Sequence, residues 1–208
     1  MALSNFTELK ASIADWMVRS DLTSVIPDFI EIAEAEMNRG LEHWKMEEGA
    51  TLSVSSRYTA LPSDFLAVKR AELDDTTPRQ MKQMSRAEMQ RQREALADAT
   101  GKPQYYAITD NQLEVFPSPD ATYSVELGYK ESVPALSDSN TTNWVLDDHT
   151  DLYLWGALAA GAMYEQDTER AMASHTKFGA LIEDINRQSR RNKFGGVGLS
   201  RPITAYGG

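Results

Sequence analysis

The chain has 208 residues, with 21 Lys and Arg against 31 Asp and Glu, which gives a formal net charge of -10 at pH 7. Its 41% hydrophobic and 25% charged residues are ordinary globular usage and exclude a wholly disordered, collagen-like or coiled-coil chain. The absence of cysteine excludes disulfides, zinc–thiolate sites and cysteine nucleophiles. The net acidity argues against wrapping nucleic acid, because neutralising phosphates requires clustered cations.

Two amphipathic helices are predicted at the N-terminus. The first covers 5–19, with apolar residues at helical spacing and a capping box formed by Asn5 and Glu8. The second is expected to begin near Pro27 and to continue past Gly40. No basic segment followed by an apolar run precedes them, so we expect no signal peptide. The water-facing side of the second helix is predicted to carry Glu31, Glu34, Glu36 and Arg39.

The middle of the chain is predicted to be β-rich. A hairpin is expected to turn at Asp110 and Asn111, two residue types that adopt left-handed backbone conformations at low cost. A short surface helix over 85–97 is predicted to begin with a capping box of Ser85 and Glu88. The predicted strands cover 50–55, 65–73, 104–108, 112–116 and 122–130.

The C-terminal part is predicted to return to helix after a polar loop over 132–143. One helix is expected over 148–166; its apolar stretch is too short to span a bilayer, so we expect a buried helix. A break at Asp167 and Thr168 separates it from a last helix over 168–192. The packing face of that last helix is predicted to hold Ala171, His175, Phe178, Ile182 and Ile185.

Together these elements predict an α+β fold: a helical bundle built from both ends of the chain, with a small, mostly antiparallel β subdomain inserted between them. The expected bundle comprises 1–48 and 146–193, the insert comprises 49–145, and 194–208 forms a C-terminal tail.

The C-terminal end of the chain, from Ile185 through the tail, differs from the rest of the chain in charge. No acidic residue follows Asp184, whereas five cations do, leaving 16 cations against 31 anions elsewhere. Two interpretations stay open. The segment could be a frayed terminus, or it could be a flexible, glycine-containing segment that becomes ordered when it binds an acidic surface or a groove on a partner. The five cations are Arg187, Arg190, Arg191, Lys193 and Arg201, and the spaced apolar residues are Phe194, Val197, Leu199, Ile203 and Tyr206.

The residues make no case for an enzyme, a cofactor or a metal. Asp147-Asp148-His149-Thr150-Asp151 has the residue types of a metal site, but its spacing fits no known ligand loop. Carboxylates at a helix start are in any case favoured by the helix dipole. No Gly-x-Ser-x-Gly elbow and no phosphate-binding loop occurs.

Four stretches in matching order resemble the head–tail adaptor family of tailed bacteriophages, the proteins similar to tail tubular protein A. One is Leu61-Pro62-Ser63-Asp64-Phe65, and another is the run from Gly101 to Tyr129 with its Gly-x-Pro opening. The other two are Ile26 to Arg39, and Val133 to Leu158 with Trp144-Val145-Leu146 inside it. The resemblance covers about residues 5 to 190.

The resemblance implies a structural virion protein at the head–tail interface, made in the host cytoplasm, without catalysis and without a membrane. Such adaptors form a homo-oligomeric ring, commonly of twelve copies, beneath the portal protein, and they give the tail or nozzle proteins a platform. Genomic DNA passes through the lumen without sequence-specific binding, and an acidic lumen would repel its phosphates. By analogy with connectors, the C-terminal tail is expected to dock on the portal through its cations and through Phe194, Leu199, Ile203 and Tyr206.

Three alternatives remain at this stage. The chain could be another neck or tail-completion protein, which would not touch the portal. It could be a nucleic-acid-binding module that uses the basic tail, although the net charge argues against this. It could also be a hydrolase or metal enzyme built on the cluster from Asp147 to Asp151.

Overall fold

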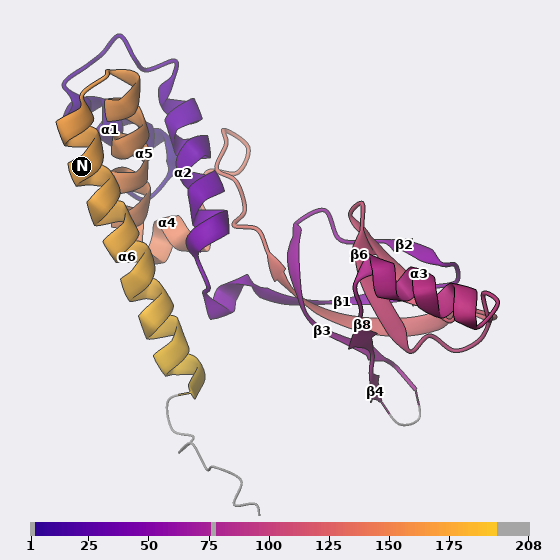
Figure 1. The fold of residues 1–208 in the computed structure, drawn as a ribbon. Coiled ribbons are helices and arrows are strands. Elements are labelled where there is room, and N and C mark those ends of the chain that lie inside the picture. The colour runs from indigo at the N-terminus through magenta and orange to yellow at the C-terminus, as the bar shows by residue number, and fades with distance from the viewer. Residues whose placement is uncertain (1–2, 76–77, 195–208) are drawn as a thin grey trace, which may run out of the picture. The chain divides into compact units, whose positions relative to one another are not determined.

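The computed structural model describes residues 3–75 and 78–194, and it has the predicted α+β class. The chain separates into two compact units, a helical unit of Met1–Trp44 with Val133–Gly208 and a β unit of Lys45–Ser132 (Figure 1). The predicted insert was 49–145; in the structure the polar loop that begins at Val133 belongs to the helical unit.

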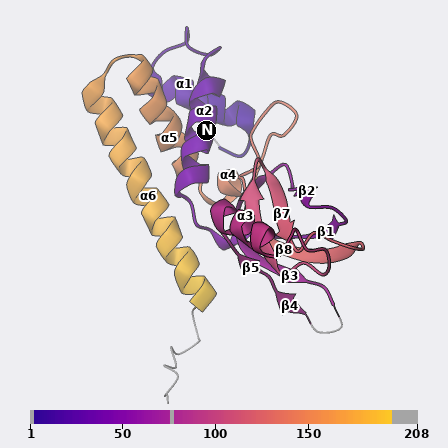
Figure 2. The same ribbon diagram turned by 45° about the vertical axis from the view of Figure 1, so that its right-hand side comes forward.

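The helical unit is organised around one central helix. Helix α5 (Thr150–Tyr164) packs against α1 (Phe6–Met17), α2 (Ile26–Gly40), α4 (Trp144–Asp148) and α6 (Thr168–Phe194). Figures 1 and 2 both show α5 between α2 and α6. Because α5 is surrounded, apolar residues occur around its whole circumference, as expected for a buried helix. No helix in the described part of the chain is long and apolar enough to cross a membrane.

The first helix begins at the predicted N-cap residue, but the side chain of Glu8 has a different hydrogen-bond partner from the predicted one. Asn5 is the N-cap, and its side chain accepts a hydrogen bond of 2.9 Å from the Glu8 amide. The Glu8 carboxylate, however, accepts from the amide and hydroxyl of Ser4, not from the Asn5 amide. The reciprocal half of the predicted capping box is therefore displaced by one residue.

The second helix is shorter than predicted. It ends at Gly40, and Leu41 is already extended at φ -77° and ψ 136°. The side chain of Asn186 on α6 replaces the missing helical bonds, since its amide donates to Gly40 O at 2.8 Å and its oxygen accepts from Glu42 N at 2.6 Å. The prediction that the helix passes Gly40 was wrong because this long-range contact stabilises the end of α2.

The C-terminal helices differ from prediction at two points. The helix expected over 148–166 is α5, two residues shorter at each end, and a short helix that was not predicted, α4, precedes it, with His149 between the two at φ -140° and ψ 53°. The break before α6 is confirmed: Asp167 accepts a hydrogen bond of 3.0 Å from the Arg170 amide. On α6 the predicted packing face is buried at Ala171, Phe178 and Ile185, but the side chain of His175 is 66% exposed.

The β unit contains two four-stranded sheets. One has the order β1 (Glu47–Val54), β8 (Tyr123–Glu131), β3 (Phe65–Leu73) and β4 (Arg79–Gln80), and every pairing in it is antiparallel. The other has the order β2 (Tyr58–Ala60), β7 (Gln112–Phe116), β6 (Tyr105–Thr109) and β5 (Lys82–Gln83), of which only β5–β6 is parallel. The short strands β2, β4 and β5 were not predicted.

The core of the β unit combines residues of both sheets. Val125, Leu127 and Tyr129 are buried on the predicted face of β8, and they cluster with Leu113 and Val115 of β7. The period-two alternation of β8 identified this face correctly.

The predicted hairpin turn and the predicted helix of this unit are both present. Asp110 and Asn111 adopt φ 50° and 58°, the left-handed conformation that their residue types favour. Helix α3 (Arg86–Ala95) begins with the complete capping box of Ser85 and Glu88. It does not lie only on the surface, however, because Met89 and Arg93 are buried.

Candidate docking surface

The predicted docking residues begin on the last turns of α6. Arg187, Arg190, Arg191 and Lys193 lie on this helix, and their side chains are exposed. Phe194 is the last helical residue. Four further predicted docking residues lie outside the described residues: Leu199, Arg201, Ile203 and Tyr206.

The end of α6 is held against the helical unit by its opposite face. Ile185 and Ser189 are buried, and the Ser189 hydroxyl accepts a hydrogen bond of 3.0 Å from the Trp44 amide. Because residues two and five positions away from Ile185 project to the other side of a helix, Arg187 and Arg190 point away from this contact. The cations therefore form an exposed strip on a helix end that is itself fixed.

One member of the strip, Arg187, has only a weak ion pair. Arg187 lies 4.0 Å from Asp184, and both side chains are more than half exposed, at 56% and 73%. Such exposed pairs contribute about 0–1 kcal/mol. A partner that presents carboxylates in a fixed arrangement could replace this pairing at little cost.

The structure also reveals a buried polar network that the sequence did not predict. Glu34 was expected to face water, but only 5% of it is exposed. Its Oε1 accepts hydrogen bonds of 2.8 Å from the Leu136 amide and of 2.8 Å from the Tyr153 hydroxyl. Asn143 donates to Tyr153 Oη at 2.7 Å and to Pro134 O at 2.6 Å. The network fixes the loop that begins at Val133 to α2 and α5.

Burial controls the proton affinities in this network. It raises the pKa of Glu34 above the usual 4.5, although the two hydrogen bonds that the carboxylate accepts act in the opposite direction. Burial and the neighbouring carboxylate also raise the pKa of Tyr153. Glu34 lies four residues after Ile30 and three before Met37, both on the predicted apolar stripe, and this helical spacing was the available sequence signal.

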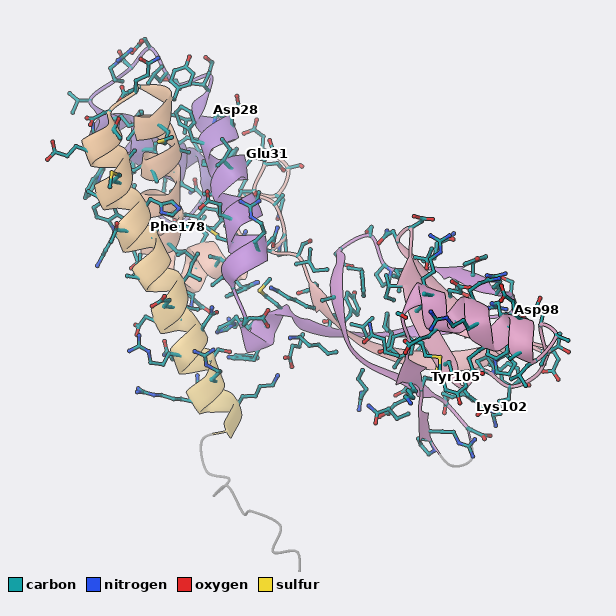
Figure 3. The ribbon with its side chains drawn as sticks, viewed as in Figure 1. Asp28, Glu31, Asp98, Lys102, Tyr105 and Phe178 are labelled. Atoms are coloured by element: carbon teal, nitrogen blue, oxygen red, sulfur yellow. The ribbon has the colours of Figure 1, made fainter. Side chains whose placement is uncertain are left out.

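A second buried charge cluster lies in the β unit. Arg93 is only 4% exposed; its guanidinium donates to Asp98 Oδ1 at 2.7 Å, Ser118 Oγ at 3.0 Å and Val115 O at 2.6 Å. Glu114 Oε1 accepts from Arg57 at 3.0 and 2.7 Å and lies 3.4 Å from Arg93 Nε. The ion pairs and hydrogen bonds of this cluster join α3 to β7, although the buried Arg93 Nε itself makes no hydrogen bond to the described residues. Asp98, Lys102 and Tyr105, at this end of the unit, are labelled in Figure 3.

The cluster from Asp147 to Asp151 divides between two helices. Asp147 lies in the first turn of α4 and Asp151 in the first turn of α5, the positions that the helix dipole favours for carboxylates. Across residues 3–75 and 78–194, no three His, Asp or Glu side chains come together as a metal site would require. The geometry therefore gives the metal-enzyme hypothesis no support.

Comparison with known proteins gives a family match over nearly the whole chain. The model of the SU10 adaptor protein family matches residues 4–202, which include both units and part of the basic tail. No curated protein matches the sequence. The closer resemblance to tail tubular protein A that the sequence motifs suggested is not part of this match.

Proposed function

The chain belongs to the SU10 adaptor protein family, and from this premise we propose that it is a head–tail adaptor, a structural protein of a tailed bacteriophage particle. The family match over residues 4–202 is the observation that carries this proposal. The buried polar clusters of both units support a structural role, since Tyr153 and Arg93 in them hydrogen-bond to neighbouring elements of the same unit.

The finer part of the proposal is a ring of copies, twelve by analogy, placed beneath the portal protein and above the tail or nozzle proteins. The strong net acidity supports a role as a conduit, because a negative lumen would let packaged DNA pass without binding it. In this role the protein belongs to the head–tail interface of the virion.

We assign portal docking to the basic end of the chain. The exposed strip of Arg187, Arg190 and Arg191 supports this assignment, as does its attachment to a fixed helix end. Arginine forms bidentate bonds with carboxylates, so acidic grooves on the portal are the complementary surface. Lys193, Phe194, Leu199, Arg201, Ile203 and Tyr206 are assigned to the same contact, with the apolar members as anchors.

The test is size-exclusion chromatography with light scattering, on the protein with and without its cognate portal. The proposal expects the adaptor to join the portal as a ring and to lose this binding when residues 194–208 are deleted. A triple variant, Arg187→Gln, Arg190→Gln and Arg191→Gln, should weaken binding at least about tenfold, which corresponds to 1.4 kcal/mol.

A matched control removes the same charge elsewhere. Arg79→Gln, Arg86→Gln and Arg91→Gln change three exposed arginines of the β unit and should leave portal binding unchanged. A protein that forms a small oligomer and ignores the portal would instead be a different neck or tail-completion protein. Tight, salt-dependent binding to duplex DNA would favour the nucleic-acid-binding alternative.

A further inference from the structure

An apolar groove lies on the surface of the helical unit, between α2 and α6 and over α5. Its volume is about 540 Å³, and large apolar side chains stand exposed on its rim. Ile32 is 50% exposed, and Met163 and Met172 are each 67% exposed. The floor consists of small residues of α5, which are Gly156, Ala159 and Ala160. The groove is therefore a concave apolar surface that no part of the described chain covers.

A second apolar patch projects from the end of α1, and it consists of Trp16 and Val18. Trp16 is 50% exposed and Val18 is 86% exposed. The ring of Trp16 makes a T-shaped contact with Trp155 of α5, with 5.8 Å between the ring centroids. The carbonyl oxygen of Trp16 accepts a hydrogen bond of 2.6 Å from Arg170 of α6. These contacts fix the patch, called the knob below, to the helical unit while the Val18 side chain projects into solvent.

The backbone of Val18 is strained. It adopts the left-handed conformation, at φ 56° and ψ 36°. Its amide donates to Asp15 O at 3.1 Å and the Arg19 amide donates to Ala14 O at 3.2 Å, the two bonds with which helices commonly end at a glycine. A β-branched residue is an outlier in this conformation. Strained positions cluster at functional sites, and the function that an exposed valine side chain offers is an apolar contact.

The knob and the groove lie on opposite sides of α6. Arg170 touches the knob through Trp16, whereas Met172 lines the groove. Two residues along a helix correspond to about 200° around its axis, so the two patches face away from each other. They lie at similar levels along α6, since its groove residues fall within 171–176. Different patches on opposite sides suit a head-to-tail contact between copies, and patches at one level favour a closed ring over a filament.

The charges beside the two patches are complementary. Glu36 lines the groove, where its side chain is 33% exposed and lies 3.6 Å from His175. On the side of the knob, Arg170 donates through Nη2 to Trp16 O and forms no ion pair with the described residues. A neighbouring copy that brought its knob to the groove would therefore also bring an arginine to a carboxylate, and such complementarity fixes the register of a contact.

We propose that copies of this chain join head to tail, with the knob of one copy inserted into the groove of the next between Ile32 and Met172, and with Arg170 of the first copy paired with Glu36 of the second. This inference deepens the proposed function and rests on it, because it supplies the contact between the copies of the proposed ring. The contact requires two copies of this chain and nothing else, so it can be tested without the portal.

Engineered cysteines test the contact, because the natural chain has none. Val18→Cys and Met172→Cys are prepared as separate single variants and are mixed in equal amounts at high concentration under oxidising conditions. The control mixture combines Val18→Cys with Lys177→Cys. Lys177 is exposed on α6, about 140° around the helix from Met172, and does not line the groove.

The proposal expects mixed dimers with Met172→Cys to form at least about tenfold faster than those with Lys177→Cys, since docking raises the effective concentration of the second thiol. Adding Glu36→Gln to the Met172→Cys chain should reduce that advantage. Equal rates in the two mixtures would overturn the proposal. Faster linkage of identical variants than of the mixed pair would also overturn it and would assign the patch to a two-fold symmetric contact.

Val18→Gly separates the contact from the fold. Glycine relieves the left-handed backbone, so the melting temperature of the free protein should stay equal or rise. Self-association, measured by sedimentation over a series of concentrations, should nevertheless weaken at least about tenfold, and undiminished association would contradict the role of the knob. The portal assay is independent of these results. A contact between knob and groove in a protein that ignores the portal would retain this inference and reject the adaptor role.

Discussion

The hydroxyl of Tyr153 donates a hydrogen bond of 2.8 Å to the carboxylate of Glu34, at a place where both side chains are buried. The same carboxylate oxygen accepts from the Leu136 amide, so one buried acid joins α2, α5 and the loop that returns the chain to the helical unit. The stability of this unit should therefore respond to the protonation of a single residue.

Glu34→Gln tests this dependence. Because burial raises the pKa of Glu34, the folded state binds the proton more tightly than the unfolded state does. The stability gained from this proton is complete below pH 4.5, the usual pKa, and is lost as the pH rises through the raised pKa of the folded state. Urea unfolding across that pH range should show a decline in the natural protein and a flatter profile in Glu34→Gln.

Comparing Glu34→Gln with Glu34→Ala tests the hydrogen bonds that the side chain at position 34 accepts. Glutamine keeps an acceptor for the Leu136 amide and the Tyr153 hydroxyl, whereas alanine leaves both donors buried without it. Alanine should reduce the free energy of unfolding by about 1–3 kcal/mol relative to glutamine. Equal stability of the two variants at every pH would contradict the role assigned to the network.

Gly156→Ala should destabilise the helical unit. The added Cβ would lie 2.8 Å from Ala33 and from Phe178, both of which are buried and cannot move aside. Overpacking of this kind costs about 1–3 kcal/mol. Gly179→Ala on α6 is the matched control, because its Cβ would meet nothing within 4 Å. Gly179→Ala should stabilise the unit by up to about 1 kcal/mol through helix propensity. Thermal unfolding should therefore show a lower melting temperature for Gly156→Ala and an equal or higher one for Gly179→Ala.

Local patterns were enough to predict much of the fold. The hairpin at Asp110 and Asn111, the capping box of Ser85 and the alternation of β8 each depend on neighbours within a few residues. The errors occurred where distant residues decide the outcome. Asn186, far along the chain, completes the hydrogen bonds at the end of α2, so the helix stops at Gly40.

In the candidate site, too, features visible in the local sequence were predicted and features that depend on distant residues were not. The basic residues of the tail were recognisable because charge is visible in sequence, and those of them within the described chain are exposed on α6. The burial of Glu34 and Arg93 was not predicted, because the partners of each come from other elements. The groove over α5 depends on three helices at once, and no segment alone carries its signature.

The hairpin turn offers a test of backbone strain in the β unit. Asn111 has φ 58°, a conformation that costs most residue types about 1–2 kcal/mol. Asn111→Gly should leave stability unchanged or slightly higher, whereas Asn111→Val should lower it by about that amount. The four tryptophans all lie in the helical unit, so hydrogen exchange at the amides of β6 and β7 in denaturant is the measurement that reports the β unit. Similar midpoints for the two variants would show that the turn relaxes to another conformation.

Arg93→Met should be among the most destabilising single changes in the β unit. It removes three hydrogen bonds, to Asp98, Ser118 and Val115, and one of the two arginines beside the buried Glu114. Removing one partner from a buried charge cluster costs about 3–5 kcal/mol, because the remaining charge keeps its desolvation penalty.

Arg91→Met, on the exposed face of the same helix, provides the control and should change stability by less than about 0.5 kcal/mol. Arg57→Met should fall between the two, since the Arg57 side chain is 36% exposed and Glu114 would keep Arg93. Hydrogen exchange at the amides of β7 measures all three variants within this unit alone. Equal protection in Arg93→Met and Arg91→Met would mean that α3 is held by Met89 packing and not by the charge cluster.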